Sequence, residues 1–307
     1  MRTKGQADAA LAASALEWTI LRPGLVIAAQ AYGGTALLRA TAALPFMQPV
    51  ISGTGTIQTV SVEDVADTVE AVIAGRIASR QVYDLVEDKT HSLANIIVAM
   101  RNWLGLSPAR IVHVPAWLVS PVCIVADGLG WIGWRSPLRS TAIEELRAGI
   151  SGNPSTLTRA TGDALSSFTQ TLEKLPSTIQ ERWFARLYFF KPVAILTLSA
   201  FWLITGVITL IDIDAAAAVL RERQVSAFWA YSAVVSGAFA DILLGACILV
   251  RPWLRFATTG MIAVTLAYLI GGTMLAPDLW RDPLGPLLKA IPAMMLALAT
   301  HLLADDR

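Results

Sequence analysis

The sequence predicts an α/β domain followed by an all-α bundle of four membrane-spanning helices. Residues 1–191 carry 17 basic and 15 acidic residues, whereas the last 116 residues carry only 7 and 8. Strand and helix patterns alternate in the first part, and a long uncharged run begins at Pro192 in the second. We therefore predict two domains, over residues 1–180 and 181–307.

The alternating patterns of the first part define its predicted elements. Helices are expected at residues 6–13, 32–43, 61–75 and 92–104, and strands at residues 16–21, near 50, near 58, at 81–86 and at 110–114. Ser61 is a favourable N-cap, and Glu63 and Asp64 place negative charge in the first turn, where the helix dipole favours it. Asp64 is expected to cap this helix or to anchor a nearby loop.

The second part contains four apolar runs of membrane-spanning length. The first, "PVAILTLSAFWLITGVITLI" at residues 192–211, has no charge over 20 residues, and a helix of that length rises about 30 Å, the thickness of a hydrocarbon core. The others are predicted at residues 225–250, 256–276 and 284–304. Short loops join the runs, which favours an antiparallel bundle.

The positions of basic residues predict the orientation of the bundle. Arg182, Arg186 and Lys191 precede the first span, and "RPWLR" at residues 251–255 separates the second from the third. Positive charge favours the cytoplasmic side, so both termini are expected in the cytoplasm. The N-terminus does not show a secretory signal pattern. A bacterial-type inner membrane is the expected location.

A further apolar stretch at residues 111–134 is not predicted to span. Pro115, Pro121, Asp127 and three glycines interrupt it, and these residues are costly in a lipid-exposed helix. A strand followed by a packed helix explains the pattern instead.

Composition excludes several classes of function. The net charge of +1 leaves no basic excess to neutralise a nucleic acid backbone. Cys123 and Cys247 are far apart in apolar stretches, and no His, Cys or carboxylate pair has metal-ligand spacing, so neither a disulfide nor a metal site is expected. The predicted partner is the lipid bilayer, with a membrane partner or a quinone as a further candidate.

Three segments of the first part carry a family resemblance. "WTILRPGLVI", "AYGGTALLRATAALP" and "GTGTIQTVSVEDVADTVEAVI" resemble, in order and spacing, the later half of an extended or atypical short-chain dehydrogenase/reductase of the epimerase and complex I accessory subunit type. The fold implied is an incomplete Rossmann-type domain. The second part, with "ERWFARLYFFKPVAILTLSAFWLITG" and "GAFADILLG", is similar to the DoxX-like membrane domains that are fused behind such reductases.

The reductase resemblance implies NAD(P) chemistry and a set of site residues. Lys4 matches the lysine of the family's Tyr-x-x-x-Lys pair, whose tyrosine would lie one residue before Met1. Arg22, Pro23 and Gly24 match the cofactor side, and Tyr32 with Gly33 the substrate side. A dinucleotide site also needs a glycine-rich turn that opens a helix. Gly53 and Gly55 are interpreted as turn residues, so this chain is not expected to bind NAD(P) tightly.

Two charged residues stand out in the apolar second part. Asp241 lies within a predicted span and needs a partner there, for which Lys289 and His301 are candidates. It is either an interhelical anchor or part of a proton or quinone site.

Two functions follow as hypotheses. One is a membrane-anchored oxidoreductase of the reductase type, inactive as this chain alone. The other is a non-enzymatic DoxX-like membrane protein whose reductase remnant serves docking or regulation. A transporter is a weaker interpretation, because no internal repeat is visible.

Overall fold

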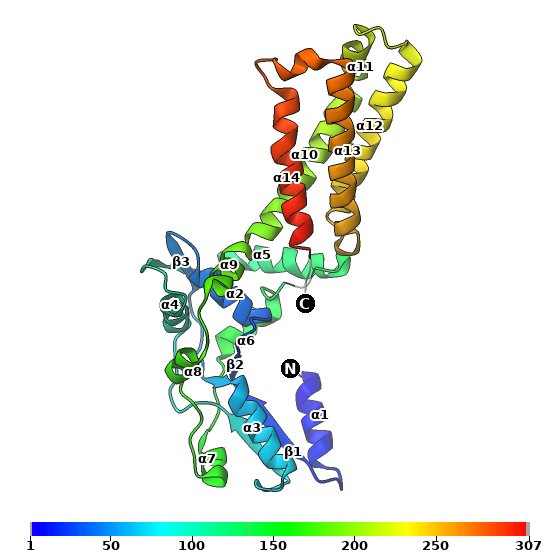
Figure 1. The fold of residues 1–307 in the computed structure, drawn as a ribbon. Helices are drawn as coiled ribbons and strands as arrows, with labels where there is room; N and C mark the ends of the chain where they lie inside the picture. Colours follow the sequence, from blue (N-terminus) through cyan, green and yellow to red (C-terminus); the bar gives the residue numbers. More distant parts are fainter. Residues whose placement is uncertain (1, 135, 305–307) are drawn as a thin grey trace. The chain divides into compact units, whose positions relative to one another are not determined.

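The computed structural model describes residues 2–134 and 136–304, and these form two compact units (Figure 1). The first, here the α/β unit, comprises Met1–Asp127 and Ser136–Tyr188. The second, here the membrane unit, comprises Phe189–Arg307 together with the short segment Gly128–Arg135. Each unit has its own core, and each is described by itself.

The strands of the α/β unit form three parallel pairs. The pairs are β1 (Thr19–Pro23) with β5 (Gln81–Leu85), β2 (Leu25–Ile27) with β4 (Thr59–Ser61), and β3 (Met47–Ile51) with β6 (Arg110–Val114). Parallel pairing requires crossover connections, and helices lie in all three of them. The first strand begins at Thr19, later than the predicted residue 16. The three-residue strand β2 was not predicted.

Nine helices of at least seven residues begin in the described part of the α/β unit. They are α1 (Arg2–Ala12), α2 (Gly33–Ala42), α3 (Val62–Ile73), α4 (Leu93–Trp103), α5 (Ala116–Leu129), α6 (Ser140–Ala148), α7 (Ser155–Thr161), α8 (Phe168–Lys174) and α9 (Ile179–Leu187). The cap at Ser61 is confirmed, because its Oγ accepts a hydrogen bond of 2.9 Å from Asp64 N. Asp64 also anchors a loop, as predicted, by accepting from Ser166 N at 3.0 Å.

Residues 111–134 form a strand followed by a helix, as predicted, but most of the helix is exposed rather than packed. Strand β6 is followed by α5, a helix of 14 residues that contains Pro121. A short 3-10 helix, η1 (Gly130–Ile132), continues it.

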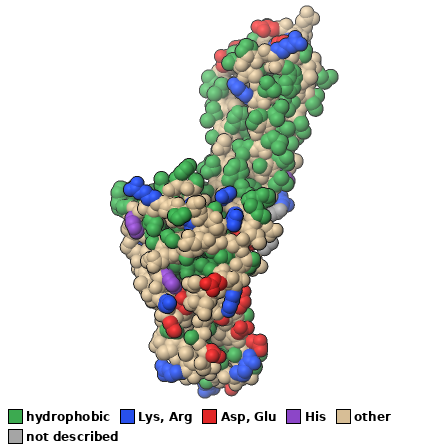
Figure 2. All heavy atoms as spheres, turned by 60° about the vertical axis from the view of Figure 1, so that its left-hand side comes forward, with side chains coloured by type: hydrophobic (Ala, Val, Ile, Leu, Met, Phe, Trp, Pro, Cys, Tyr) green, Lys and Arg blue, Asp and Glu red, His purple; other side chains and the backbone are tan. Residues whose placement is uncertain are grey.

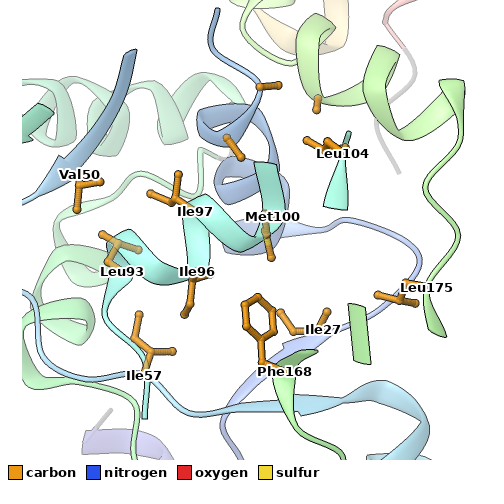
Figure 3. Close-up of a cluster of buried hydrophobic side chains, with 13 residues drawn as sticks. Ile27, Val50, Ile57, Leu93, Ile96, Ile97, Met100, Leu104, Phe168 and Leu175 are labelled. Atoms are coloured by element: carbon orange, nitrogen blue, oxygen red, sulfur yellow. The ribbon is translucent and has the colours of Figure 1, made fainter. Parts of the chain in front are cut away.

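The main core of the α/β unit forms around α4 (Figure 3). Ile96 and Met100 of this helix point toward Ile27 and Phe168, whereas Ile97 points to the opposite side of the helix. All five are almost fully buried. Burial of a side chain of this size stabilises a fold by about 1.5–3 kcal/mol. The hydrophobic side of α4 therefore holds β2 and α8 in one core.

A buried carboxylate, Glu87, joins three segments of the same unit. Its side chain is 1% exposed. It accepts hydrogen bonds from Thr59 N at 3.1 Å and Thr59 Oγ1 at 2.5 Å on β4, and from Phe168 N at 2.9 Å at the start of α8. The His91 ring lies beside it, with Nε2 3.1 Å from its carboxylate. Several donors thus offset the cost of burying the charge.

The membrane unit is all-helical. Its helices are α10 (Phe190–Ile211), α11 (Ile213–Arg221), α12 (Ala227–Cys247), α13 (Leu254–Leu275) and α14 (Pro286–Leu302), with short 3-10 helices η2 (Arg251–Trp253) and η3 (Pro277–Trp280). Figure 1 shows the four long helices running side by side. Figure 2 shows hydrophobic side chains gathered on the visible face of these helices. Such a surface suits lipid rather than water.

Three stretches of the described chain are long and apolar enough to cross a membrane: Ile179–Ile211, Ala227–Cys247 and Arg251–Leu275. They cover the first three predicted spans. The fourth predicted span corresponds to α14, whose 17 residues form a shorter apolar helix with a rise of about 26 Å. The protein is therefore a membrane protein, and the fourth crossing stays a prediction. The short amphipathic helix α11, which follows the first span, was not predicted.

Small residues bring α10 and α12 into close contact. A Cβ added at Gly206 would lie 2.8 Å from Ala238 O, and one at Gly245 would lie 2.9 Å from Leu203 N. Ser199 Oγ donates a hydrogen bond of 2.7 Å to Gly245 O across the same interface. Close backbone approach and interhelical hydrogen bonds are the usual sources of helix association in lipid.

Candidate functional sites

The predicted lysine and arginine lie at one corner of the α/β unit, formed by α1 and the end of β1. Arg22 Nη2 is 3.0 Å from Asp8 Oδ2, and Nε of the same guanidinium is 3.3 Å from it. Asp8 lies one helical turn after Lys4, so both project from the same side of α1. Lys4 is exposed to solvent. This solvent-exposed ion pair connects α1 to the carboxyl end of β1, and Lys4 lies one helical turn before Asp8 on α1.

Gly24 occupies the most crowded position of this corner. Its N–H donates to Leu85 O at 2.9 Å, and a Cβ added there would lie 2.5 Å from Gln58 O. The glycine is thus needed for close approach of two backbones, immediately after Pro23 ends β1. Packing alone therefore explains the glycine of the Arg-Pro-Gly sequence. A cofactor-facing role for these residues stays a prediction.

Tyr32 and Gly33 form the start of α2. Tyr32 N donates to Thr35 Oγ1 at 3.2 Å, and Gly33 has a positive φ of 53°. The Tyr32 side chain is 74% exposed. Among the hydrogen bonds and ion pairs of the described residues, none joins this turn to Lys4 or Arg22. The structure accounts for the glycine as a turn residue and leaves the tyrosine ring accessible.

The Gly-x-Gly sequence at Gly53 and Gly55 is a turn, as predicted. Gly53 has a φ of 74°, and a Cβ added at Gly55 would lie 2.7 Å from Gly149 N and Cα. The next regular element is β4 rather than a helix. No helix N-terminus therefore follows these glycines to receive a pyrophosphate.

Asp241 lies within the membrane unit, on α12, and its partner is Tyr268 of α13. The Tyr268 hydroxyl donates to Asp241 Oδ1 at 3.4 Å, a long hydrogen bond. Gly237, one turn before Asp241, makes room for this hydroxyl, since a Cβ added there would lie 2.7 Å from it. A Cβ at Gly206 of α10 would lie 3.1 Å from the Cβ of Asp241. Three helices thus meet at the carboxylate.

The two partners predicted for Asp241 lie elsewhere. Lys289 is exposed in the first turn of α14, where its backbone N–H donates to Gly285 O at 3.0 Å. His301 Nδ1 is 2.9 Å from Thr258 Oγ1. Sequence reasoning identified Asp241 but not its partner Tyr268. The contact between the two depends on how α12 and α13 align, which the sequence does not show.

The described residues also contain buried polar groups that the sequence did not reveal. Arg101, only 5% exposed, donates to Ala42 O at 2.6 Å and to Leu44 O at 2.8 Å, where α2 ends.

Within residues 2–134 and 136–304, no group of three or more His, Cys, Asp or Glu side chains has the geometry to hold a metal ion.

Comparison with known proteins gives a match for the membrane unit. The model of the DoxX-like family matches residues 199–298, from the middle of α10 to α14. No curated protein matches the chain, so the resemblance of the first part to reductases stays an expectation from sequence. The membrane unit of this protein contains a DoxX-like domain.

Proposed function

We propose that this protein is a membrane-anchored protein of the reductase type, in which the α/β unit supplies the edge of an NAD(P) site and the DoxX-like bundle is the anchor. The ion pair between Asp8 and Arg22 supports the proposal, because it links the helix that carries Lys4 to the strand that ends at Pro23, directly before Gly24. Ligands of open α/β folds bind at the carboxyl ends of strands. Lys4 would contact the ribose of the cofactor.

The described residues do not fit a whole dinucleotide. Gly53 and Gly55 precede a strand, and Gly55 packs against Gly149 rather than facing an open cradle. The pyrophosphate therefore has no helix N-terminus at this turn. We derive no catalytic step through NAD(P) and expect only weak binding by this chain.

Titration of the detergent-solubilised chain with NADPH tests the proposal. We expect a dissociation constant of about 1 mM or weaker, a free energy of about −4 kcal/mol. Lys4→Ala and Arg22→Ala are expected to abolish this binding, and Lys89→Ala, which removes another exposed lysine of the same unit, serves as the matched control. Micromolar affinity would contradict the incomplete site. Equal binding by all variants would contradict the roles of Lys4 and Arg22.

A second candidate is a non-enzymatic membrane protein with a docking or regulatory α/β unit. The observation that favours it is the pairing of Arg22 with Asp8, which engages Nε and Nη2 of the guanidinium within the protein. No binding of NADPH at 10 mM, with the fold intact by circular dichroism, would favour this candidate over the first.

For the membrane unit we propose four crossings, with both termini in the cytoplasm of a bacterial-type cell, and Asp241 as an interhelical anchor. The contact with Tyr268 and the close packing of Gly206 support the anchor over a proton or quinone site. Reporter fusions after residues 224, 253, 283 and 304 test the crossings. Activity of a cytoplasmic reporter at 253 and 304 but not at 224 and 283 fits the proposal, and an inactive reporter at 304 together with an inactive one at 283 would remove α14 as a span.

A further inference from the structure

The exposed side of helix α5 is apolar, the reverse of a helix on a water-soluble surface. Its exposed large side chains are Trp117, Leu118, Val122, Ile124, Val125 and Leu129. At 100° per residue these six positions cover one half of the helix circumference. The next turn, η1, adds Trp131, which is 93% exposed. These exposed apolar side chains form a strip that has a tryptophan at each end, Trp117 and Trp131.

The opposite side of α5 faces the protein. Cys123 and Ala126 are buried there. The single charged residue of the helix, Asp127, lies on the same side and is paired, because it accepts from Ser140 Oγ at 2.5 Å and from Arg139 Nε at 3.1 Å. No charge thus interrupts the exposed apolar half of α5.

The chain that follows α5 belongs to the membrane unit. Residues 128–134 cluster with its helices, and the Trp134 indole Nε1 donates to Leu249 O at 2.7 Å, just after the end of α12. Arg251 Nη1 donates to Gly133 O at 3.3 Å from η2. These contacts lie at the turn between two membrane-spanning helices. The residues that directly follow α5 in the sequence are therefore held at the end of two spans, where a bilayer surface begins.

We propose that α5 and η1 form an interfacial helix, with the strip from Trp117 to Trp131 buried at the boundary between headgroups and acyl chains. Lying on the surface suits this segment better than crossing it. It has 17 residues, Pro121 interrupts its backbone hydrogen bonds, and Asp127 is kept on the protein side. Tryptophan is favourable at the headgroup level, where its ring is apolar and its N–H is wet. The inference is independent of the proposed reductase role.

Spin labelling of the full chain tests this placement. The variants Leu118→Cys and Val125→Cys, in a background with Cys123→Ala and Cys247→Ala, each receive a nitroxide label and are reconstituted in vesicles of phosphatidylcholine and phosphatidylglycerol. The collision rates of the label with oxygen, which partitions into lipid, and with a water-soluble nickel chelate are compared. We expect the ratio of the two rates to be several-fold higher at both positions than at Glu144→Cys, an exposed position on α6.

Two controls keep the result decisive. Phe239→Cys, an exposed position near the middle of α12, reports insertion of the bundle and is expected to give a lipid value. If it does so while both α5 labels give the value of Glu144→Cys, the interfacial helix is wrong. If the α5 labels broaden each other's spectra and the broadening disappears on dilution with unlabelled protein, a second copy covers the strip and the proposal is also wrong.

Discussion

The α/β unit contains a buried carboxylate and the membrane unit a half-buried one, and they hold it in different ways. Glu87 accepts three hydrogen bonds, two of them from backbone N–H groups, and has the His91 ring beside it. Asp241 has one long contact with a tyrosine hydroxyl. The first carboxylate replaces backbone pairing between segments, whereas the second lies between helices that already satisfy their own backbones. Removing the first should therefore cost much more than removing the second.

The largest effect is expected for Glu87→Ala. The substitution leaves Thr59 N and Phe168 N without acceptors in a buried place, which should destabilise the α/β unit by about 3 kcal/mol. Pulse proteolysis of the full chain in urea, read as cleavage of this unit, measures the loss. Asp88→Ala, which removes the exposed neighbouring carboxylate, is the matched control. If Glu87→Ala lost no more stability than Asp88→Ala, the proposed difference between the two carboxylates would be wrong.

Helix packing in the membrane unit should give the next largest effect. Gly206→Ala places a methyl group against the backbone of α12, and overpacking of this kind costs about 2 kcal/mol. Gly271→Ala is the control, because a Cβ on that glycine of α13 meets nothing within 4 Å. Unfolding of the reconstituted protein by detergent titration compares them. Equal stability of the two variants would contradict the close contact of α10 and α12.

A small effect is expected at the intramembrane pair. Asp241→Asn and Tyr268→Phe should each change stability by less than about 1 kcal/mol, since interhelical hydrogen bonds in membranes contribute about 0.6 kcal/mol on average. A double-mutant cycle in the same detergent titration gives the coupling energy. Little loss of stability together with a large loss of a membrane activity would identify Asp241 as a functional group instead of an anchor.

The smallest effect concerns Asp127 and acid pH. Its hydrogen bond from Ser140 is the main cause that lowers the pKa of the carboxyl below its ordinary value, with Arg139 contributing. A group whose pKa is lower in the folded state stabilises the fold above its unfolded pKa of about 3.9, and the contribution disappears as pH falls through the folded value. Stability should thus fall slightly more between pH 5 and 3 for the native chain than for Asp127→Asn. Parallel curves would exclude this contribution.

Local signals predicted much of the α/β unit. Ser61 and the two acids after it marked a helix start that the structure places at Val62. Proline and an acidic residue correctly marked residues 111–134 as a strand and helix. Hydrogen bonds between residues that are far apart in the sequence could not be predicted from it. Glu87 and Phe168, for example, are 81 residues apart. Asp241 contacts Tyr268 rather than Lys289, because the alignment of α12 and α13 decides which side chain lies beside it.

Residues 128–134 belong to the membrane unit although the segments on both sides of them belong to the α/β unit, and this has a practical consequence. Trp134 and Gly133 bind the turn after α12, so the membrane unit is assembled from two separate parts of the sequence. The match to the DoxX-like family covers only residues 199–298. A protein expressed from Phe189 onward would lose the indole that binds Leu249 O. The compact membrane unit therefore extends beyond the residues that the family model matches, and a truncation for biochemical work should retain residues 128–134 or supply them as a separate peptide.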